Sequence, residues 1–167
     1  VLALVCLAVV SCKKDDDDNN NGNNGNTVYN PCPNVSGYTC IPDPNFEEAL
    51  IDLGHDDVID GQVLTANISS VQSLWIENKN ISDLTGLEDF TALEGLSCPY
   101  NQLTSLDVSQ NTNLGHLECS SNQLTSLDLS QNTALTELHC GGYQLTCLNL
   151  KNGNNINLLA YNFTSNP

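Results

Sequence analysis

The sequence contains no arginine, and its four lysines stand against 20 acidic residues, which gives a formal net charge of −16. An anionic surface of this kind repels the phosphates of nucleic acids and offers no basic stripe to hold them. We therefore expect no nucleic acid partner. Cations, or basic patches on other proteins, suit this charge better.

Motifs of familiar catalytic sites are also missing. The three histidines, His55, His116 and His139, have no serine or cysteine nucleophile in an elbow motif and no aspartate at a recognisable partner spacing. No glycine-rich phosphate loop follows a predicted strand. The sequence therefore predicts a noncatalytic protein that uses no cofactor.

No methionine opens the chain, which begins at Val1, so we interpret the sequence as truncated at its start. Residues 1–10 are apolar without interruption, and small Ser11 separates them from Cys12. This run has the length of a signal-peptide core and is too short to span a bilayer as a helix. Residues 1–11 are therefore predicted to be a signal peptide.

The segment LAVVSC resembles the lipobox of bacterial lipoproteins, which implies that Cys12 is acylated and becomes the mature N-terminus. An ordinary secretory signal with an incidental cysteine is the alternative. KKDDDD, directly after Cys12, resembles the signal that sends some lipoproteins of the Bacteroidetes group to the outer face of the outer membrane. These resemblances imply a membrane anchor through Cys12 and display on the cell surface, with the periplasmic face as the alternative. Residues 12–30, acidic and rich in asparagine, should form a disordered tether.

Residues 31–70 are expected to form an N-terminal cap. Cys32 and Cys40 lie eight positions apart around proline, glycine and serine, which in an exported protein favours a small disulfide loop over a metal-binding pair. A helix is predicted next, capped by Asp43 and ended by Gly54. Its apolar stripe consists of Phe46, Ala49, Leu50 and Leu53. The following acidic segment does not match the EF-hand spacing, and it is interpreted as a polar turn at Asp56, Asp57 and Asp60.

A repeat with a period of 21 residues occupies the rest of the chain. The corresponding positions are Leu93, Leu114, Leu135 and Ile156; Leu96, Leu117, Leu138 and Leu159; Cys98, Cys119, Cys140 and Tyr161; and Leu103, Leu124 and Leu145. Each unit reads LxxLxCxxNxL, which resembles the bacterial leucine-rich repeat family over about residues 71–167. The resemblance implies a leucine-rich repeat solenoid with a short curved parallel β-sheet, few helices and the predicted helix as its N-terminal cap.

The physics of a solenoid assigns a role to the repeated polar and sulfur-containing residues. The repeated asparagines, Asn101 and Asn122, should point inward and satisfy backbone groups in the bends. The three repeated cysteines occupy apolar positions and should act as small buried hydrophobes. Cys147 replaces a serine of the other repeats and is interpreted as an exposed thiol.

The two halves of each repeat differ in how much they change. The half that reads TSLD is nearly constant, whereas the cysteine-containing half reads LEGLSCPY, LGHLECSS and LTELHCGG. Because a specific ligand surface has to vary along its length, we expect the cysteine-containing half to form the sheet and the recognition surface. Alternation along the strands predicts a ligand-binding face made of Trp75, Glu77, Ser97, His116, Glu118, Glu137 and His139.

Parallel strands lie roughly 4.8 Å apart, which should place His116 beside Glu137 and Glu118 beside His139. Three interpretations remain open for this patch: a solvated polar surface, a protein or glycan contact zone with Trp75 as an aromatic platform, or a divalent metal site. On the constant half, Asp107, Asp128 and Asn149 form a second ladder. Hydrogen bonds from Ser109 and Ser130, rather than a bound cation, should relieve its like charges.

Taken together, these features predict a noncatalytic protein-binding or adhesion module, as the resemblance to internalin-like repeat proteins implies. The alternative is a carbohydrate-binding accessory lipoprotein of a glycan-capture system, in which the repeats display a face for sugars. A glycan array distinguishes the two functions. Strong binding of a sugar by the purified domain that is lost in Trp75→Ala would favour the carbohydrate-binding protein.

Overall fold

The computed structural model describes residues 35–142, 144–151, 153 and 160–162. The predicted signal peptide, Cys12, the tether and Cys32 lie outside these residues. The N-terminal part contains strand β1 (Tyr38–Cys40), helix α1 (Pro44–Asp52), strand β2 (Gln62–Leu64) and helix α2 (Thr65–Ile68). None of the helices in the described residues is long and apolar enough to cross a bilayer.

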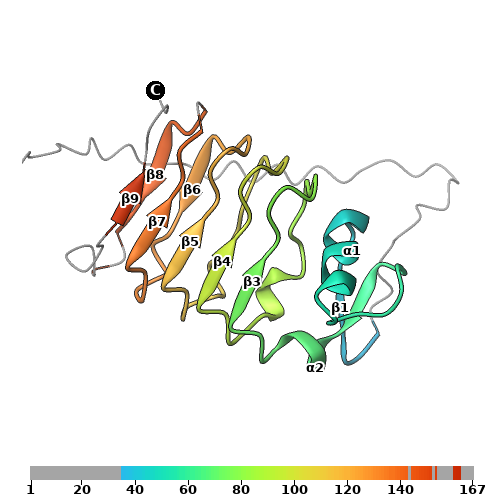
Figure 1. Ribbon diagram of the computed structural model, residues 1–167. Helices are drawn as coiled ribbons and strands as arrows, with labels where there is room; N and C mark the ends of the chain where they lie inside the picture. Colours follow the sequence, from blue (N-terminus) through green and yellow to red (C-terminus); the bar gives the residue numbers. More distant parts are fainter. Residues whose placement is uncertain (1–34, 143, 152, 154–159, 163–167) are drawn as a thin grey trace, which may run out of the picture.

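The repeats form a parallel β-solenoid (Figure 1). Its main sheet has the order β3-β4-β5-β7-β9, and a short 3-10 helix, η1 (Leu87–Asp89), follows β3 in the chain. The strands are β3 (Ser73–Trp75), β4 (Gly95–Ser97), β5 (His116–Glu118), β7 (Glu137–His139) and β9 (Ala160–Asn162). The predicted leucine-rich repeat solenoid is thereby confirmed, and the cysteine-containing half of each repeat forms its sheet, as expected.

The constant half of the repeat also contributes strands, which the sequence did not predict. Strand β6 (Ser126–Asp128) pairs in parallel with β8 (Cys147–Asn149) to form a second, two-stranded sheet. Asp128 lies opposite Asn149, whose side-chain amide donates to the Asp128 carboxylate at 3.1 Å. The predicted ladder is therefore present between Asp128 and Asn149, whereas Asp107 lies outside the strands.

Helix α1 begins where the sequence predicts. The Asp43 carboxylate accepts from the backbone N–H groups of Asn45 and Phe46, and Pro44 occupies the first turn. The predicted apolar stripe is wrong at one end, because Leu53 is 42% exposed. Glu47 is buried instead, since its Oε1 accepts the backbone N–H groups of residues 60–62 at 2.7–3.1 Å.

These three bonds hold the acidic segment after α1, which supports its interpretation as a polar turn. Strand β2 follows this turn and pairs antiparallel with β1. Cys40, at the end of β1, is disulfide-bonded. Because Cys32 lies outside the described residues, the Cys32–Cys40 pairing stays a prediction.

Helix α1 packs against the first turn of the solenoid. The ring of Phe46 stacks on Phe90 with a centroid distance of 6.3 Å. The second oxygen of Asp43 accepts the backbone N–H and hydroxyl of Ser82 at 2.7 and 2.8 Å. Gly86, at a φ of +103°, passes so close to Ile41 that a Cβ atom there would collide with it.

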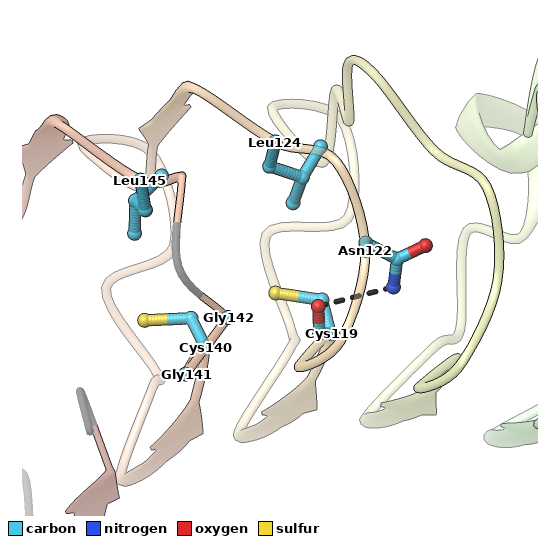
Figure 2. A pocket seen from close by; sticks show the side chains of 7 residues that line it. All are labelled: Cys119, Asn122, Leu124, Cys140, Gly141, Gly142 and Leu145. Atoms are coloured by element: carbon cyan, nitrogen blue, oxygen red, sulfur yellow. Dashed lines mark hydrogen bonds between the residues drawn. The ribbon is translucent and has the colours of Figure 1, made fainter. Parts of the chain in front are cut away.

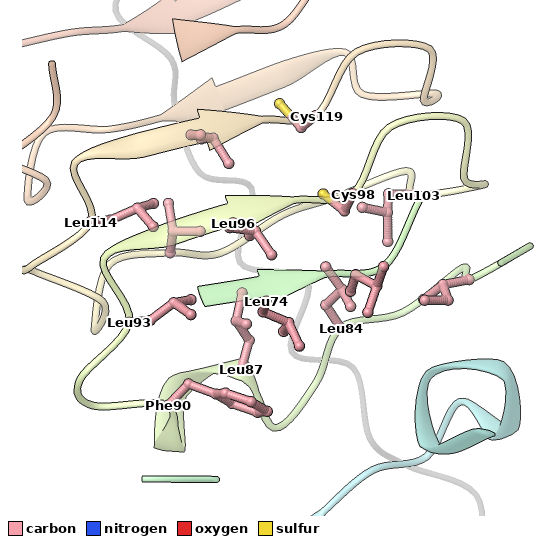
Figure 3. Close-up of a cluster of buried hydrophobic side chains, with 14 of the residues drawn as sticks. Leu74, Leu84, Leu87, Phe90, Leu93, Leu96, Cys98, Leu103, Leu114 and Cys119 are labelled. Carbon is pink, nitrogen blue, oxygen red and sulfur yellow. The ribbon is translucent and has the colours of Figure 1, made fainter. Parts of the chain in front are cut away.

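The core consists of stacked rows of leucine with phenylalanine at the α1 end (Figure 3). Cys98, Cys119 and Cys140 continue this core as buried thiols, which confirms that they act as hydrophobes. Burial raises the pKa of Cys98 and Cys140 to about 12 and that of Cys119 well above its ordinary value. These thiols therefore stay protonated and unreactive. Cys147 is disulfide-bonded, so its interpretation as an exposed thiol is wrong.

Buried asparagines satisfy the bends, as predicted. Asn101 Oδ1 accepts the backbone N–H groups of Lys79 and Ile81, both at 3.0 Å, and its amide donates to the carbonyls of Ile76 and Cys98. The side-chain amides of a second buried pair, Asn111 and Asn132, donate to backbone carbonyls of the preceding turn: Leu87 and Phe90 for Asn111, and Val108 and Asn111 for Asn132. That pair was not predicted, although both residues stand in the repeated SQNT segment.

Candidate ligand-binding face

The outward residues of the main sheet form one surface, which we call the variable face: Ser73, Trp75, Gly95, Ser97, His116, Glu118, Glu137 and His139. Two rows cross the strands. Ser73, Gly95, His116 and Glu137 are in register in one row, and Trp75, Ser97, Glu118 and His139 in the other. The predicted neighbours, His116 beside Glu137 and Glu118 beside His139, are confirmed.

Aromatic rings connect these strands. The Trp75 indole is 53% exposed, and its ring centroid lies 5.9 Å from that of His116, although β4 separates their strands. It can reach that far because β4 presents only Gly95 and Ser97, and a Cβ atom on Gly95 would lie 3.9 Å from the indole. His116 is in turn 6.2 Å from His139. The result is a continuous row of three rings.

One carboxylate binds both histidines. Glu137 Oε2 lies 3.1 Å from His116 Nδ1, and Glu137 Oε1 lies 3.0 Å from His139 Nε2. Hydrogen bonds from His139 and His116 lower the pKa of Glu137 below its ordinary 4.5. The Glu118 carboxylate instead accepts the Ser120 hydroxyl at 3.2 Å. The strand register thus agrees with the prediction, while the side-chain pairing centres on Glu137.

The remaining predicted residues differ in accessibility. Ser97 is only 3% exposed, because its small side chain lies between the larger Trp75 and Glu118 on the neighbouring strands. Ser97 forms the floor of the variable face, and its role as a ligand contact stays a prediction. Glu77 is exposed in the turn that follows β3.

Tyr100 is a further residue of this surface that sequence reasoning missed. It follows β4, is 66% exposed, and has a φ of +56°. The turns on either side place Asn78 and Ser121 at this left-handed position. A bulky aromatic residue is costly there, so the available signal was a tyrosine where neighbouring turns have small polar residues.

The aspartates of the constant half accept local hydrogen bonds. The carboxylates of Asp107 and Asp128 each accept the backbone N–H two residues further on, from Ser109 and Ser130, at 2.9 Å. Burial alone would raise the pKa of Asp128, but the hydrogen bonds from Ser130 and Asn149 lower it. The expectation that local hydrogen bonds relieve this ladder is confirmed.

Two hollows lie away from the variable face. A cavity of about 10 Å³ beside Cys119, Asn122 and Cys140 is at the lower limit for one water molecule (Figure 2). A groove of about 390 Å³ runs between residues 83–88 and 105–110. The carboxylates of Asp83 and Glu88 at its edge each accept a backbone N–H of their own turn. Within the described residues, no three His, Cys, Asp or Glu side chains are grouped so that they could hold a metal ion.

Solved structures share this architecture. The functional domain of InlJ from Listeria monocytogenes, which includes a cysteine ladder, superposes with a TM-score of 0.66 at 33% identity over 77% of this chain and 29% of that chain. The chain has an internalin-like leucine-rich repeat fold. The internalins InlF and InlC2 of the same species give TM-scores of 0.63 and 0.62 at 20% and 18% identity, covering 76% and 81% of this chain and 44% and 72% of theirs.

The sequence similarity covers a smaller region. Internalin J of Listeria monocytogenes is 41% identical over 74 residues, which is 42% of this chain and 8% of that protein. The chain therefore spans a small part of the length of this curated relative. No known family model matches the sequence.

Proposed function

We propose that the variable face is a noncatalytic surface that binds a protein partner, in adhesion or recognition. The observation that carries this proposal is the row of rings from Trp75 through His116 to His139. It is built from residues that differ in every turn, while the scaffold beneath them repeats. A half-exposed tryptophan on a rigid sheet is typical of the residues that dominate binding energy at protein interfaces.

The geometry also reduces the entropic cost of binding. The ring of His116 lies between those of Trp75 and His139, and the Glu137 carboxylate bonds both imidazoles. Side chains that are already held in place lose less freedom when a partner arrives. The similarity to internalin J and its relatives supports a binding role, although the chain spans only a small part of internalin J.

The test is a selection from a random dodecapeptide library displayed on phage, using the immobilised domain. Peptides recovered on the wild-type protein are then measured by calorimetry against Trp75→Ala and against Asp128→Asn, which alters the constant half. The proposal expects binding to be lost in the first variant and kept in the second. Peptides that bind both variants as well as the wild type would contradict it.

A carbohydrate ligand is the second candidate, because an exposed indole such as Trp75 can also stack on a sugar ring. A glycan array probed with the purified domain tests it. Strong sugar binding that disappears in Trp75→Ala would favour a role as a carbohydrate-binding accessory protein. Sugar binding that survives this substitution, or no sugar binding at all, would reject it.

Display at the cell surface through an acylated Cys12 is part of the proposed function. Its support is the apolar run of residues 1–10 and the LAVVSC segment. More than one acyl chain on a cysteine anchors a soluble domain firmly, since a single chain gives only marginal binding. When the full-length gene is expressed in a bacterium, the protein should partition into the detergent phase of Triton X-114, and Cys12→Ala should move it to the aqueous phase. An unchanged partition would contradict the anchor.

A further inference from the structure

Negative charge on and beside the variable face is not balanced by lysine. Three carboxylates, Glu77, Glu118 and Glu137, belong to the face or to the turn beside it. Of the two lysines in the described residues, Lys79 bonds Asp52 of α1 at 2.7 Å, and Lys151 follows β8 of the other sheet. The only groups on the face that can carry positive charge are therefore the imidazoles that bind Glu137.

Trp75 and Glu118 stand on either side of a small residue. They share one row of the sheet with Ser97 between them, so their backbones are two strand spacings apart, roughly 10 Å. Ser97 is buried and does not project between them. No described basic side chain forms an ion pair with Glu118, which accepts the Ser120 hydroxyl.

We infer that the variable face binds a segment of its partner that carries arginine or lysine, with the cationic side chain over Trp75 and paired to Glu118. A guanidinium or ammonium group is attracted to the face of an indole and forms a charge-assisted hydrogen bond with a carboxylate. The aliphatic stem of such a side chain can cover the floor above Ser97. This inference rests on the proposed function of the same face and specifies the chemistry of the partner.

A neutral sugar fits the same surface less well. It would stack on Trp75 but would remove the Glu118 carboxylate from water without supplying a positive charge, which costs free energy. The net charge of −16 also accelerates the approach of a cationic partner and slows that of an anionic one.

The single tryptophan of the sequence makes the test local, because fluorescence excited at wavelengths that tyrosine does not absorb reports only on Trp75. The probes are the peptide acetyl-Gly-Arg-Gly-Arg-Gly-Arg-Gly-amide and the same peptide with citrulline in place of arginine, which keeps the shape without the charge. We expect a saturable change in fluorescence with the arginine peptide. The citrulline peptide should bind at least about tenfold more weakly, and affinity for arginine should fall as salt is raised.

Two substitutions that each remove one negative charge separate the site from the general acidity of the chain. Glu118→Gln should weaken the arginine peptide about fivefold, whereas Asp128→Asn, on the constant half, should change its affinity by less than about twofold. Both variants should keep the melting temperature of the wild type, since Glu118→Gln retains an acceptor for Ser120.

Several outcomes would overturn the inference: no saturable response to the arginine peptide, an equal response to both peptides, or an equal loss in the two variants. Cellohexaose, a neutral hexasaccharide, serves as the third probe. If it saturates the Trp75 signal while the arginine peptide does not, the cationic partner is rejected and the variable face remains a binding surface. Failure of the face itself is distinguishable, because peptides selected from the phage library would then bind independently of Trp75.

Discussion

The two halves of each solenoid turn satisfy their polar groups in different ways. On the constant half, Asp107 and Asp128 each accept an N–H from two residues further along their own turn. On the variable face, Glu137 bonds His116 from the preceding turn as well as His139 on its own strand. Contacts between turns occur on both halves, but on the constant half they recur with the period, as when Asn111 and Asn132 each donate to a carbonyl of the turn before. On the variable face such contacts join residues that change from turn to turn. We conclude that the repeated residues build the scaffold, whereas the residues that change between turns form the proposed binding surface.

The largest effect should come from the scaffold. Asn101→Ala removes a side chain that makes hydrogen bonds with two backbone N–H groups and two carbonyls, in a position that is 7% exposed. The free energy of unfolding should fall by about 3 kcal/mol, because several buried backbone groups lose their partners. Urea denaturation measures this. Gln102→Ala, at the exposed neighbouring position, is the control and should cost less than about 0.5 kcal/mol.

A smaller effect is expected from Asp43, which lies where α1 meets the solenoid. Its carboxylate accepts hydrogen bonds from its own helix and from the first turn of the solenoid. It caps its own helix and also accepts from Ser82 and Asp83. Asp43→Ala should lower the free energy of unfolding by about 1–2 kcal/mol at neutral pH. Thermal denaturation of both proteins gives the difference.

The pH dependence of that difference provides a second check. Burial alone would raise the pKa of Asp43, but the hydrogen bonds from Ser82, Asn45 and Asp83 lower it below the ordinary 3.8. A depressed pKa stabilises the folded state above pH 3.8, and this contribution is lost as the pH falls through the folded-state value. The wild type and Asp43→Ala should therefore converge in stability under acid conditions. A difference that stays constant from neutral pH to about pH 2.5 would contradict this assignment.

The next substitution should raise stability. Tyr100 holds a left-handed conformation that suits the asparagine of the preceding turn, Asn78, better than an aromatic residue. Tyr100→Asn should increase the free energy of unfolding by about 1 kcal/mol, while Tyr100→Phe should leave it unchanged. A loss of stability in Tyr100→Asn would show that the ring supports the scaffold and is not simply presented to a partner.

The smallest expected effect concerns metal ions. The double substitution His116→Ala, His139→Ala should leave any binding of zinc, measured by calorimetric titration, unchanged. The reason is that the carboxylate near these imidazoles is shared between them, and the described residues contain no group of three or more ligands arranged for a metal. If the wild type bound zinc and the variant did not, the variable face would be a metal site and its contrast with the constant half would need another explanation.

How much the sequence could predict depends on whether a feature follows from the period. The strand register follows from it, so His116 was correctly placed beside Glu137, and Glu118 beside His139. The pairing of His139 with Glu137 on its own strand depends on side-chain rotamers, which the period does not determine. The period also does not predict the contact between Trp75 and His116 across β4. This contact depends on the small size of both Gly95 and Ser97.

Outside the repeats, periodicity was a weaker guide. Leu53 was expected to be buried on the apolar stripe of α1, but it is the residue that caps the C-terminal end of the helix, and it is exposed. Glu47, in the first turn of α1, is buried because the turn at residues 60–62 supplies three N–H donors to its carboxylate. The burial of Glu47 arises from a tertiary contact that no local pattern contains.

The central claim is that binding depends on the residues that change between turns and not on those that repeat. Giving one turn the residues of the following turn tests this claim directly. His116→Glu with Glu118→His gives β5 the outward residues of β7, whereas Val108→Leu with Asn113→Ala gives one constant half the residues of the following one. With a peptide selected on the wild-type domain, calorimetry should show binding lost in the first variant and kept in the second, while both remain folded. Loss of binding in the constant-half variant, with binding kept in the other, would contradict the account.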